Sequence, residues 1–201
     1  MQVIMMDVDG VLVRGRPADG RPFATDLEVD LGISAAVLQR EFFKPHWVGI
    51  VTGQHPMKPT LERVLAEIAP KVPVDTFIDY WFRNDSRLDL EVLDALTDYR
   101  RDGVRVLLAT NQEHMRADYL MNTLGLAGQV DGIIYSAAVG YRKPSVEFYE
   151  GATERAGVHP KGIALVDDTL ENVVAAQAFG WNAVHWQDGM QLRAALEAIS
   201  A

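Results

Sequence analysis

The sequence contains no cysteine, which excludes disulfides, thiolate catalysis and cysteine-bound metal. It has no apolar run close to the roughly 20 residues that cross a bilayer. Its first ten residues also lack the basic start and the long apolar stretch of a signal peptide. Lys and Arg number 19 against 28 Asp and Glu, so the positive excess of a nucleic-acid surface is missing. These absences predict a cytoplasmic protein with no membrane or nucleic-acid partner.

Hydrophobic residues, by contrast, are plentiful, at 48% of the 201 residues against 23% charged residues. This composition is ordinary for a globular protein and supports a sizeable core. The length suits one moderate domain, or a core with a smaller inserted module. The net charge of −9 still allows a small anionic substrate, provided that a metal, a lysine or a helix N-terminus supplies local positive charge.

Short apolar runs alternate with helical stretches along most of the chain. Five runs have the length and composition of buried strands, at residues 3–6, 104–109, 132–135, 163–166 and 183–185. Helices are predicted over 90–101, after residue 111 to near 124, after 145 to near 157, after 168 to 180, and over 190–199. This alternation predicts an α/β fold with a Rossmann-like, doubly wound parallel sheet. Ligands bind such a sheet beyond the carboxyl ends of its strands.

Residues 16–85 break the alternation, because they carry little strand signal. Residues 34–43 and 59–68 have the pattern of amphipathic helices, and residues 76–82 that of a short aromatic one. An ordinary connection between two strands would be far shorter. We therefore predict a helical cap domain over residues 16–85, inserted into a core domain of residues 1–15 and 86–201.

The first polar cluster, Asp7 and Asp9, follows the first predicted strand, and Gly10 relieves crowding in the turn. Two carboxylates at this spacing can face one small volume. Asp7 can then attack phosphorus and ligate a cation, while Asp9 can offer its backbone carbonyl to a metal and its carboxyl as acid and base. For this cluster alone, a solvated Asx turn is the alternative.

Two further clusters can bind an anion. Thr110 and Asn111 follow the second strand, where a hydroxyl and free N–H groups make an anion site. For this cluster alone a simple helix N-cap is the favoured explanation, and it is compatible with an anion site. Lys143 follows the third strand and suits a phosphate group, with an ordinary surface lysine as the alternative.

The fourth cluster is the acidic pair Asp167 and Asp168, directly after the fourth strand. Such pairs suit hard cations such as magnesium. Capping of the next helix, completed by Glu171, is the structural alternative, but adjacent carboxylates repel each other and make a purely structural role less favourable.

Together these clusters resemble the phosphatases of the haloacid dehalogenase (HAD) superfamily. Its members carry D-x-D-G, a strand ending in Thr or Ser, a Lys before Pro, and a terminal acidic pair. Here the motifs read DVDG at 7–10, LATN at 108–111, RKP at 142–144 and VDD at 166–168. The run DDTLEN at 167–172 is similar to the D-D-x-x-x-N pattern of subfamily I, whose helical C1 cap matches the inserted segment in position and character.

This resemblance implies a magnesium-dependent phosphohydrolase that acts on a small phosphorylated metabolite, with sugar phosphates as the family's habit. Asp7 would form an aspartyl-phosphate, and Asp9 would act as acid and base. Mg²⁺ would be held by Asp7, the Asp9 carbonyl and Asp168. Asp167 would belong to the same metal site, or would orient waters or Lys143 beside it.

The resemblance also implies the phosphate contacts. Lys143, the Thr110 hydroxyl and the Asn111 N–H would bind the equatorial oxygens of the phosphate. The cap would close over the site and set specificity.

Specificity candidates in or near the cap are His46, Trp47, His55 and Trp81, with Arg14 at the hinge. Burial in the core is the alternative for both tryptophans. The five histidines show no ligand spacing typical of zinc.

Other functions remain open at this point. A phosphotransferase or phosphomutase of the same superfamily would use the same residues. A dehalogenase is less favoured, because family dehalogenases lack an aspartate at the position of Asp9 and need no metal. A receiver-type signalling domain carries its acidic pair first rather than last. The intact set of residues disfavours a phosphate-binding relative without turnover, and the oligomeric state stays open. Neither a G-x-x-x-x-G-K-[ST] nor a G-x-G-x-x-G motif is present.

Overall fold

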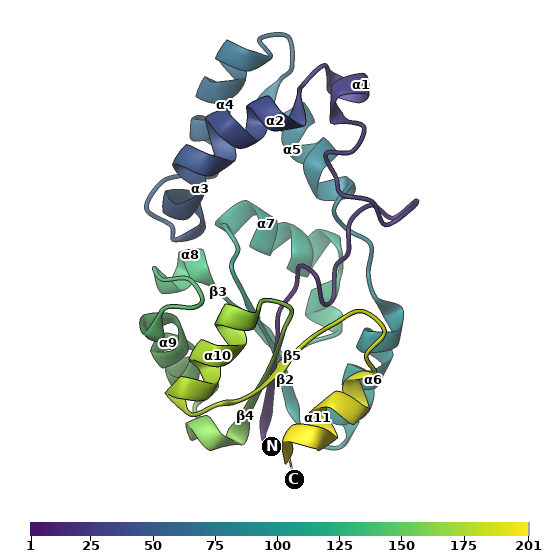
Figure 1. The fold of residues 1–201 in the computed structure, drawn as a ribbon, viewed down its shortest axis with the longest axis vertical. Helices are drawn as coiled ribbons and strands as arrows, with labels where there is room; N and C mark the ends of the chain where they lie inside the picture. Colours follow the sequence, from purple (N-terminus) through teal and green to yellow (C-terminus); the bar gives the residue numbers. More distant parts are fainter. Residues whose placement is uncertain (201) are drawn as a thin grey trace.

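The computed structural model describes residues 1–200, which fold around a parallel sheet of five strands (Figure 1). The strands are β1 (Val3–Met6), β2 (Arg105–Thr110), β3 (Gly132–Tyr135), β4 (Ile163–Asp167) and β5 (Asn182–His185). Their order across the sheet is β3-β2-β1-β4-β5. The chain therefore winds outward from β1 on one side and then returns to wind outward on the other, which confirms the predicted doubly wound sheet.

The central strand β1 is buried on both faces, as its uninterrupted apolar sequence predicts. Ile4 and Met6 join one hydrophobic cluster, while Val3 and Met5 join the other, because successive side chains point to opposite faces. The first cluster is closed by α6 (Leu90–Arg101) and α11 (Leu192–Ser200). The second is closed by α9 (Val146–Ala156) and α10 (Leu170–Phe179).

The remaining core elements are short and lie near the ends of β2, β3 and β4. They are α7 (His114–Asp118), which continues into the π-helical turn η2 (Tyr119–Thr123), η3 (Leu126–Gly128), α8 (Ser136–Val139) and η4 (Pro160–Gly162).

A separate helical layer stands beyond the carboxyl ends of the strands, at the top of Figure 1. It consists of α1 (Leu27–Leu31), α2 (Ala35–Leu38), the π-helical turn η1 (Gln39–Phe43), α3 (Lys44–Val51), α4 (Met57–Ile68) and α5 (Val74–Arg83). These helices pack around a third hydrophobic cluster that includes Phe42, Leu61 and Phe77. We call this layer the cap. Its predicted limits of 16–85 stay a prediction, and Ala201, the last residue of the predicted core, lies outside the described residues.

The helix predicted over residues 34–43 is longer in the structure. Consecutive helical elements run from Ala35 to Val51, through Pro45. A proline lacks the N–H that an α-helix needs, so its position argues for an end to the helix. Here the wide π-helical turn η1 immediately precedes α3, in which Pro45 occupies the first turn, where that N–H is not required. The short helices α1 and α8 were also not predicted, because one turn carries no periodicity.

Strand register places the candidate site. Met6 pairs with Leu108 on one side and with Val166 on the other. Asp7 and Asp167, which follow Met6 and Val166, therefore emerge at the same edge of the sheet, facing the cap. Across residues 1–200, no helix combines the length and apolar character that crossing a membrane requires.

Candidate active site

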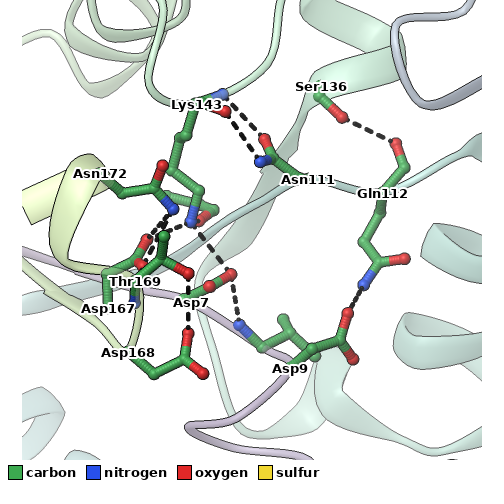
Figure 2. A network of polar contacts seen from close by, with 12 residues as sticks. Asp7, Asp9, Asn111, Gln112, Ser136, Lys143, Asp167, Asp168, Thr169 and Asn172 are labelled. Carbon is green, nitrogen blue, oxygen red and sulfur yellow. Dashed lines mark hydrogen bonds and ion pairs between the residues drawn. The ribbon is translucent and has the colours of Figure 1, made fainter. Parts of the chain in front are cut away.

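Asp7 and Lys143 meet at the centre of the edge of the sheet that faces the cap (Figure 2). The Asp7 N–H continues the strand ladder by donating to the Val166 carbonyl at 2.9 Å. The Lys143 Nζ lies 3.0 Å from the Asp7 Oδ1, which also accepts from the Val8 N–H at 2.8 Å. The carboxylate is thus fixed from the backbone and from a cation more than 130 residues away in the chain.

Lys143 is buried, which makes the alternative of an ordinary surface lysine wrong. Its Nζ donates to the Ala109 carbonyl and to the Asp167 Oδ2, each at 2.6 Å, in addition to its contact with Asp7. Burial lowers the pKa of Lys143, but the charges of Asp7 and Asp167 outweigh burial, so the pKa lies above its ordinary value. The structure therefore holds a charged lysine against Asp7.

Asp167 is occupied by contacts within the protein. Its Oδ2 accepts from Lys143 and from the Asn172 Nδ2 at 3.1 Å. Its Oδ1 accepts from the Thr169 N–H at 2.9 Å and from the Asn172 Nδ2 at 3.0 Å. The structural alternative, in which the acidic pair caps the next helix, is wrong, because the N-cap residue of α10 is Thr169.

A cluster of carboxylates can hold a cation. One oxygen each from Asp7, Asp167 and Asp168 lies within 4.8 Å of the others, and an all-oxygen donor set suits Mg²⁺. Gly10 makes room for Asp168: a Cβ at Gly10 would lie 2.0 Å from the Asp168 Oδ2, and its φ of +80° favours glycine. The Asp9 carboxyl is not part of this cluster.

The electrostatics of Asp7 follow from this crowding. Burial is the main reason that the pKa of Asp7 is raised, Lys143 opposes the rise, and Asp167 and Asp9 add to it. A negative charge on Asp7 is therefore disfavoured at this buried point, and a divalent cation would favour it by offsetting the repulsion from the other carboxylates.

Asp9 faces the cleft beside this cluster. The Gln112 Nε2 donates to its Oδ2 at 2.5 Å. Asp9 is exposed to the cleft, but partial desolvation of its carboxyl raises its pKa to about 6; Asp85 adds to the rise, and Arg116 opposes it. A carboxyl with this pKa is populated in both protonation states near neutral pH, as an acid–base group must be.

Thr110 is buried with an Oγ1 that has no hydrogen-bond partner within the described chain. A buried hydroxyl without a partner is costly, which points to a ligand that supplies one. The alternative that Thr110 and Asn111 cap the next helix is wrong, because Glu113 caps α7. The Asn111 side chain instead clamps Lys143: its Nδ2 donates to the Lys143 carbonyl at 3.0 Å, and its Oδ1 accepts from the Lys143 N–H at 2.8 Å.

A cleft of about 670 Å³ lies in front of Asp9 and Asp168, between the segments that join the cap to the core and the loop after β5. Of the five specificity candidates, Arg14 lines it, whereas the other four are absent from the lining in residues 1–200. Trp81 is buried in the cap, where it stacks on Phe23 with ring centroids 5.4 Å apart. Phe23, which does line the cleft, was not predicted.

Two further polar residues of the site, Gln112 and Asn172, are not among the site residues predicted from the sequence. Gln112 carried a weak signal, because it directly follows Thr110 and Asn111 at the end of β2. Asn172 is the last residue of the D-D-x-x-x-N pattern, but the pattern does not show its contact with Asp167, which depends on the first turn of α10.

Comparison with known proteins gives a family and a fold. Residues 1–180 match the model of a family described as haloacid dehalogenase-like hydrolases. A sesquiterpene phosphatase from Aspergillus oryzae is 35% identical over 104 residues, which are 52% of this chain and 53% of that protein. The match therefore spans about half the length of this curated relative.

Solved structures agree in fold along almost the whole chain. A HAD family enzyme from Bacteroides thetaiotaomicron, in complex with magnesium and inorganic phosphate, has a TM-score of 0.78 at 17% identity and covers 96% of this chain and 97% of its own. A predicted HAD-like family hydrolase from Porphyromonas gingivalis has a TM-score of 0.79 at 17% identity, and the match covers 100% of this chain and 98% of that one.

Proposed function

We propose that this chain, which belongs to the haloacid dehalogenase-like hydrolase family, is a magnesium-dependent phosphohydrolase of a small phosphate ester. One observation carries the proposal: Asp7 lies beside the buried Lys143 and within a cluster of carboxylates. The phosphatase name of the Aspergillus oryzae relative and the magnesium and phosphate in the Bacteroides thetaiotaomicron enzyme support the same chemistry.

The residues present fit a magnesium ion. Asp7 and Asp168 would hold it with the Asp9 backbone carbonyl, and bound Mg²⁺ would neutralise charge on the phosphate and orient it. Asp167 would act beside the ion, because it accepts four hydrogen bonds from the protein, one of them from the Lys143 Nζ, which it holds in place.

Phosphate binding would use the positive and donor groups near Asp7. Lys143 lies beside the carboxylate that attacks, so its charge would offset the repulsion between that carboxylate and the phosphate dianion. The Thr110 hydroxyl, which has no partner in the described chain, would donate to a phosphate oxygen. The Asn111 N–H would bind a further oxygen, while its side chain holds Lys143.

In the first step an Asp7 carboxylate oxygen would bond to phosphorus as the bond from phosphorus to the ester oxygen breaks. Asp9 would protonate the departing oxygen, so that an alcohol leaves and an aspartyl-phosphate remains. In the second step the Asp9 carboxylate would take a proton from water, and that water would attack phosphorus. Inorganic phosphate leaves, and the Asp7 carboxylate is restored.

The leaving alcohol would occupy the cleft in front of Asp9. This cleft is lined by polar groups, among them Asp85 and Gln187, and by apolar ones, among them Phe23 and Trp186. A sugar phosphate suits the polar part of this lining. Phosphates of apolar alcohols are a second class of candidate substrate. The apolar part of the lining and the sesquiterpene in the name of the Aspergillus oryzae relative support it.

The decisive experiment is a screen of phosphate monoesters that contains sugar phosphates, isoprenyl monophosphates and p-nitrophenyl phosphate. Phosphate release should require Mg²⁺, stop with EDTA, and fall at least about a thousandfold in Asp7→Asn, because an amide is a poor nucleophile. Asp102→Asn, at an exposed aspartate at the end of α6, is the matched control and should keep wild-type rates.

Three outcomes would contradict the proposal. Full activity of Asp7→Asn would remove its nucleophile. Transfer of phosphate to an added acceptor in place of water would indicate a phosphotransferase. Metal-independent halide release from a 2-haloacid would indicate a dehalogenase.

A further inference from the structure

Gln112 is a buried side chain whose amide reaches into the site. It is 3% exposed, and its Nε2 donates to the Asp9 Oδ2 at 2.5 Å (Figure 2). Within residues 1–200, no other group hydrogen-bonds to the Asp9 carboxyl. Gln112 alone therefore restricts the rotation of this carboxyl about its Cβ–Cγ bond, a torsion that is otherwise broad.

The loop that carries Gln112 is itself fixed. The Gln112 carbonyl accepts from the Ala137 N–H at 3.2 Å, and the buried Ser136 Oγ lies 3.2 Å from the same oxygen. On one side of Gln112, Asn111 is tied to Lys143. On the other side, Glu113 accepts from the Met115 N–H at 2.8 Å and caps α7. The amide is thus presented to Asp9 from a rigid backbone.

We infer that Gln112 is a positioning residue, whose amide orients the Asp9 carboxyl for proton transfer to the leaving oxygen. This inference rests on the proposed function. Because Oδ2 accepts from the amide, Oδ1 is the oxygen left to carry the proton. The Asp9 side chain lines the cleft, so a fixed Oδ1 can face the departing alcohol.

The hydrogen bond also favours the proton transfer itself. When the bond from phosphorus to the ester oxygen breaks, its electron pair stays on that oxygen, which takes the proton from Oδ1. Asp9 then becomes a carboxylate, and a carboxylate accepts a stronger hydrogen bond from an amide than a neutral carboxyl does. Gln112 would therefore stabilise the product side of the step more than the reactant side.

The choice of leaving group separates this role from a structural one. A p-nitrophenolate departs readily without a proton, whereas an alkoxide does not. The quantity kcat/KM covers the steps up to cleavage of the ester, so the later hydrolysis of the aspartyl-phosphate does not affect it. Loss of positioning should thus lower kcat/KM for an alkyl phosphate far more than for p-nitrophenyl phosphate.

The test compares Gln112→Met with the wild type on both substrates in saturating Mg²⁺. Methionine keeps the length of the side chain but offers no donor. We expect kcat/KM to fall about tenfold or more for the alkyl phosphate and less than about threefold for p-nitrophenyl phosphate. Gln129→Met, at an exposed glutamine, is the matched control and should leave both values unchanged.

An equal loss on both substrates would overturn the inference, because a distorted site does not distinguish leaving groups. No loss on either substrate would overturn it as well. If the wild type hydrolyses no ester of the screen, the proposed function fails together with the inference. Activity of the wild type with equal losses in the variant refutes the inference alone.

Discussion

At the scale of the residue, the site depends on a lysine without solvent contact, whose charge must be balanced by acceptors. The acceptors that contact the Lys143 ammonium are the carboxylates of Asp7 and Asp167 and the Ala109 carbonyl. Each acceptor is buried too, so none can turn to water if the ammonium is lost. Lys143 is therefore both a phosphate-binding candidate and a support of the fold.

Lys143→Met should weaken both properties. Removing the ammonium leaves two buried carboxylates uncompensated, and we expect the free energy of unfolding in urea to fall by about 3 kcal/mol. Phosphatase activity should fall at least about tenfold. Lys161→Met, at an exposed lysine of η4, provides the comparison and should change neither quantity. Wild-type stability of Lys143→Met would refute the structural half of this prediction.

The sequence could indicate the charged residues of the site but not all of their partners. Asp7 and Asp167 follow apolar runs directly, and that placement predicts where they emerge. Gln112 and Asn172 are uncharged residues of common types, so their types alone do not mark them as site residues. Their burial and their hydrogen bonds to Asp9 and Asp167 are visible only in the structure. The roles of all these residues stay predictions until variants are measured.

At the scale of the element, the turn after β1 sets the approach of β4. Gly10 has a φ of +80°, and the space where its Cβ would stand is filled by the Asp168 carboxyl. The two acidic turns can therefore come together only because this position has no side chain.

Gly10→Ala should displace Asp168 and weaken metal binding. We expect the Mg²⁺ concentration for half-maximal activation to rise about tenfold or more. Gly103→Ala is a close control, because Gly103 has a φ of +85° but no atom within 4 Å of an added Cβ. Both variants carry backbone strain, so both should lose stability, yet only Gly10→Ala should change the Mg²⁺ requirement. An equal Mg²⁺ requirement in the two variants would count against this role of the turn.

A second element, α7, holds the segment that returns from the cap. Arg116 is buried and donates to the Phe82 carbonyl at 3.2 Å and to the Asp85 carbonyl. Its guanidinium also lies 5.2 Å from the Phe82 ring centroid and 5.3 Å from that of Tyr119. The end of α5 is thus tied to the core through one side chain.

Arg116→Met should reduce the free energy of unfolding by about 3 kcal/mol, because it leaves the Phe82 and Asp85 carbonyls without this donor and Asp85 without its ion-pair partner. Urea denaturation measures the change. Arg101→Met is the control, since Arg101 is largely exposed and makes one ion pair of 3.5 Å within its helix. If both variants unfold at the same urea concentration, the contacts of Arg116 with Phe82 and Asp85 do not stabilise the fold.

Elements were predictable where they are long and periodic, and much less so elsewhere. The five strands and the long helices of the core follow from their apolar patterns. The extension through Pro45 was missed, because it depends on the π-helical turn before α3, which no local rule anticipates. The arrangement of the cap over the strand ends depends on contacts between distant segments, such as the Ser136 hydroxyl with the Val51 carbonyl at 2.5 Å.

At the scale of the whole molecule, the site gathers negative charge from separate parts of the chain. Asp7 comes from β1, whereas Asp167 and Asp168 come from β4 and the turn after it. Lys143 supplies one positive charge against these three carboxylates. A divalent cation would therefore join two distant segments and stabilise the folded state.

Mg²⁺ should accordingly raise the melting temperature of the wild type. A ligand at one hundred times its Kd stabilises a protein by about 2.7 kcal/mol, which for this length corresponds to about 5 °C or more. Asp168→Asn should abolish most of this shift, and Asp102→Asn should keep it. A shift of the same size in Asp168→Asn, measured by calorimetry, would place the cation elsewhere.

The central place of β1 has a consequence for how the protein is made. On the ribosome, β1 emerges before both of its neighbouring strands, which are translated more than 90 residues later. The cap lies between β1 and these strands in the chain and has a hydrophobic cluster that consists mainly of its own residues. Asp7 is therefore synthesised well before β4, and it gains its surroundings only when β4 has been translated. A nascent chain that stopped before β4 would contain the residues of the cap but would lack Asp167 and Asp168 of the candidate site.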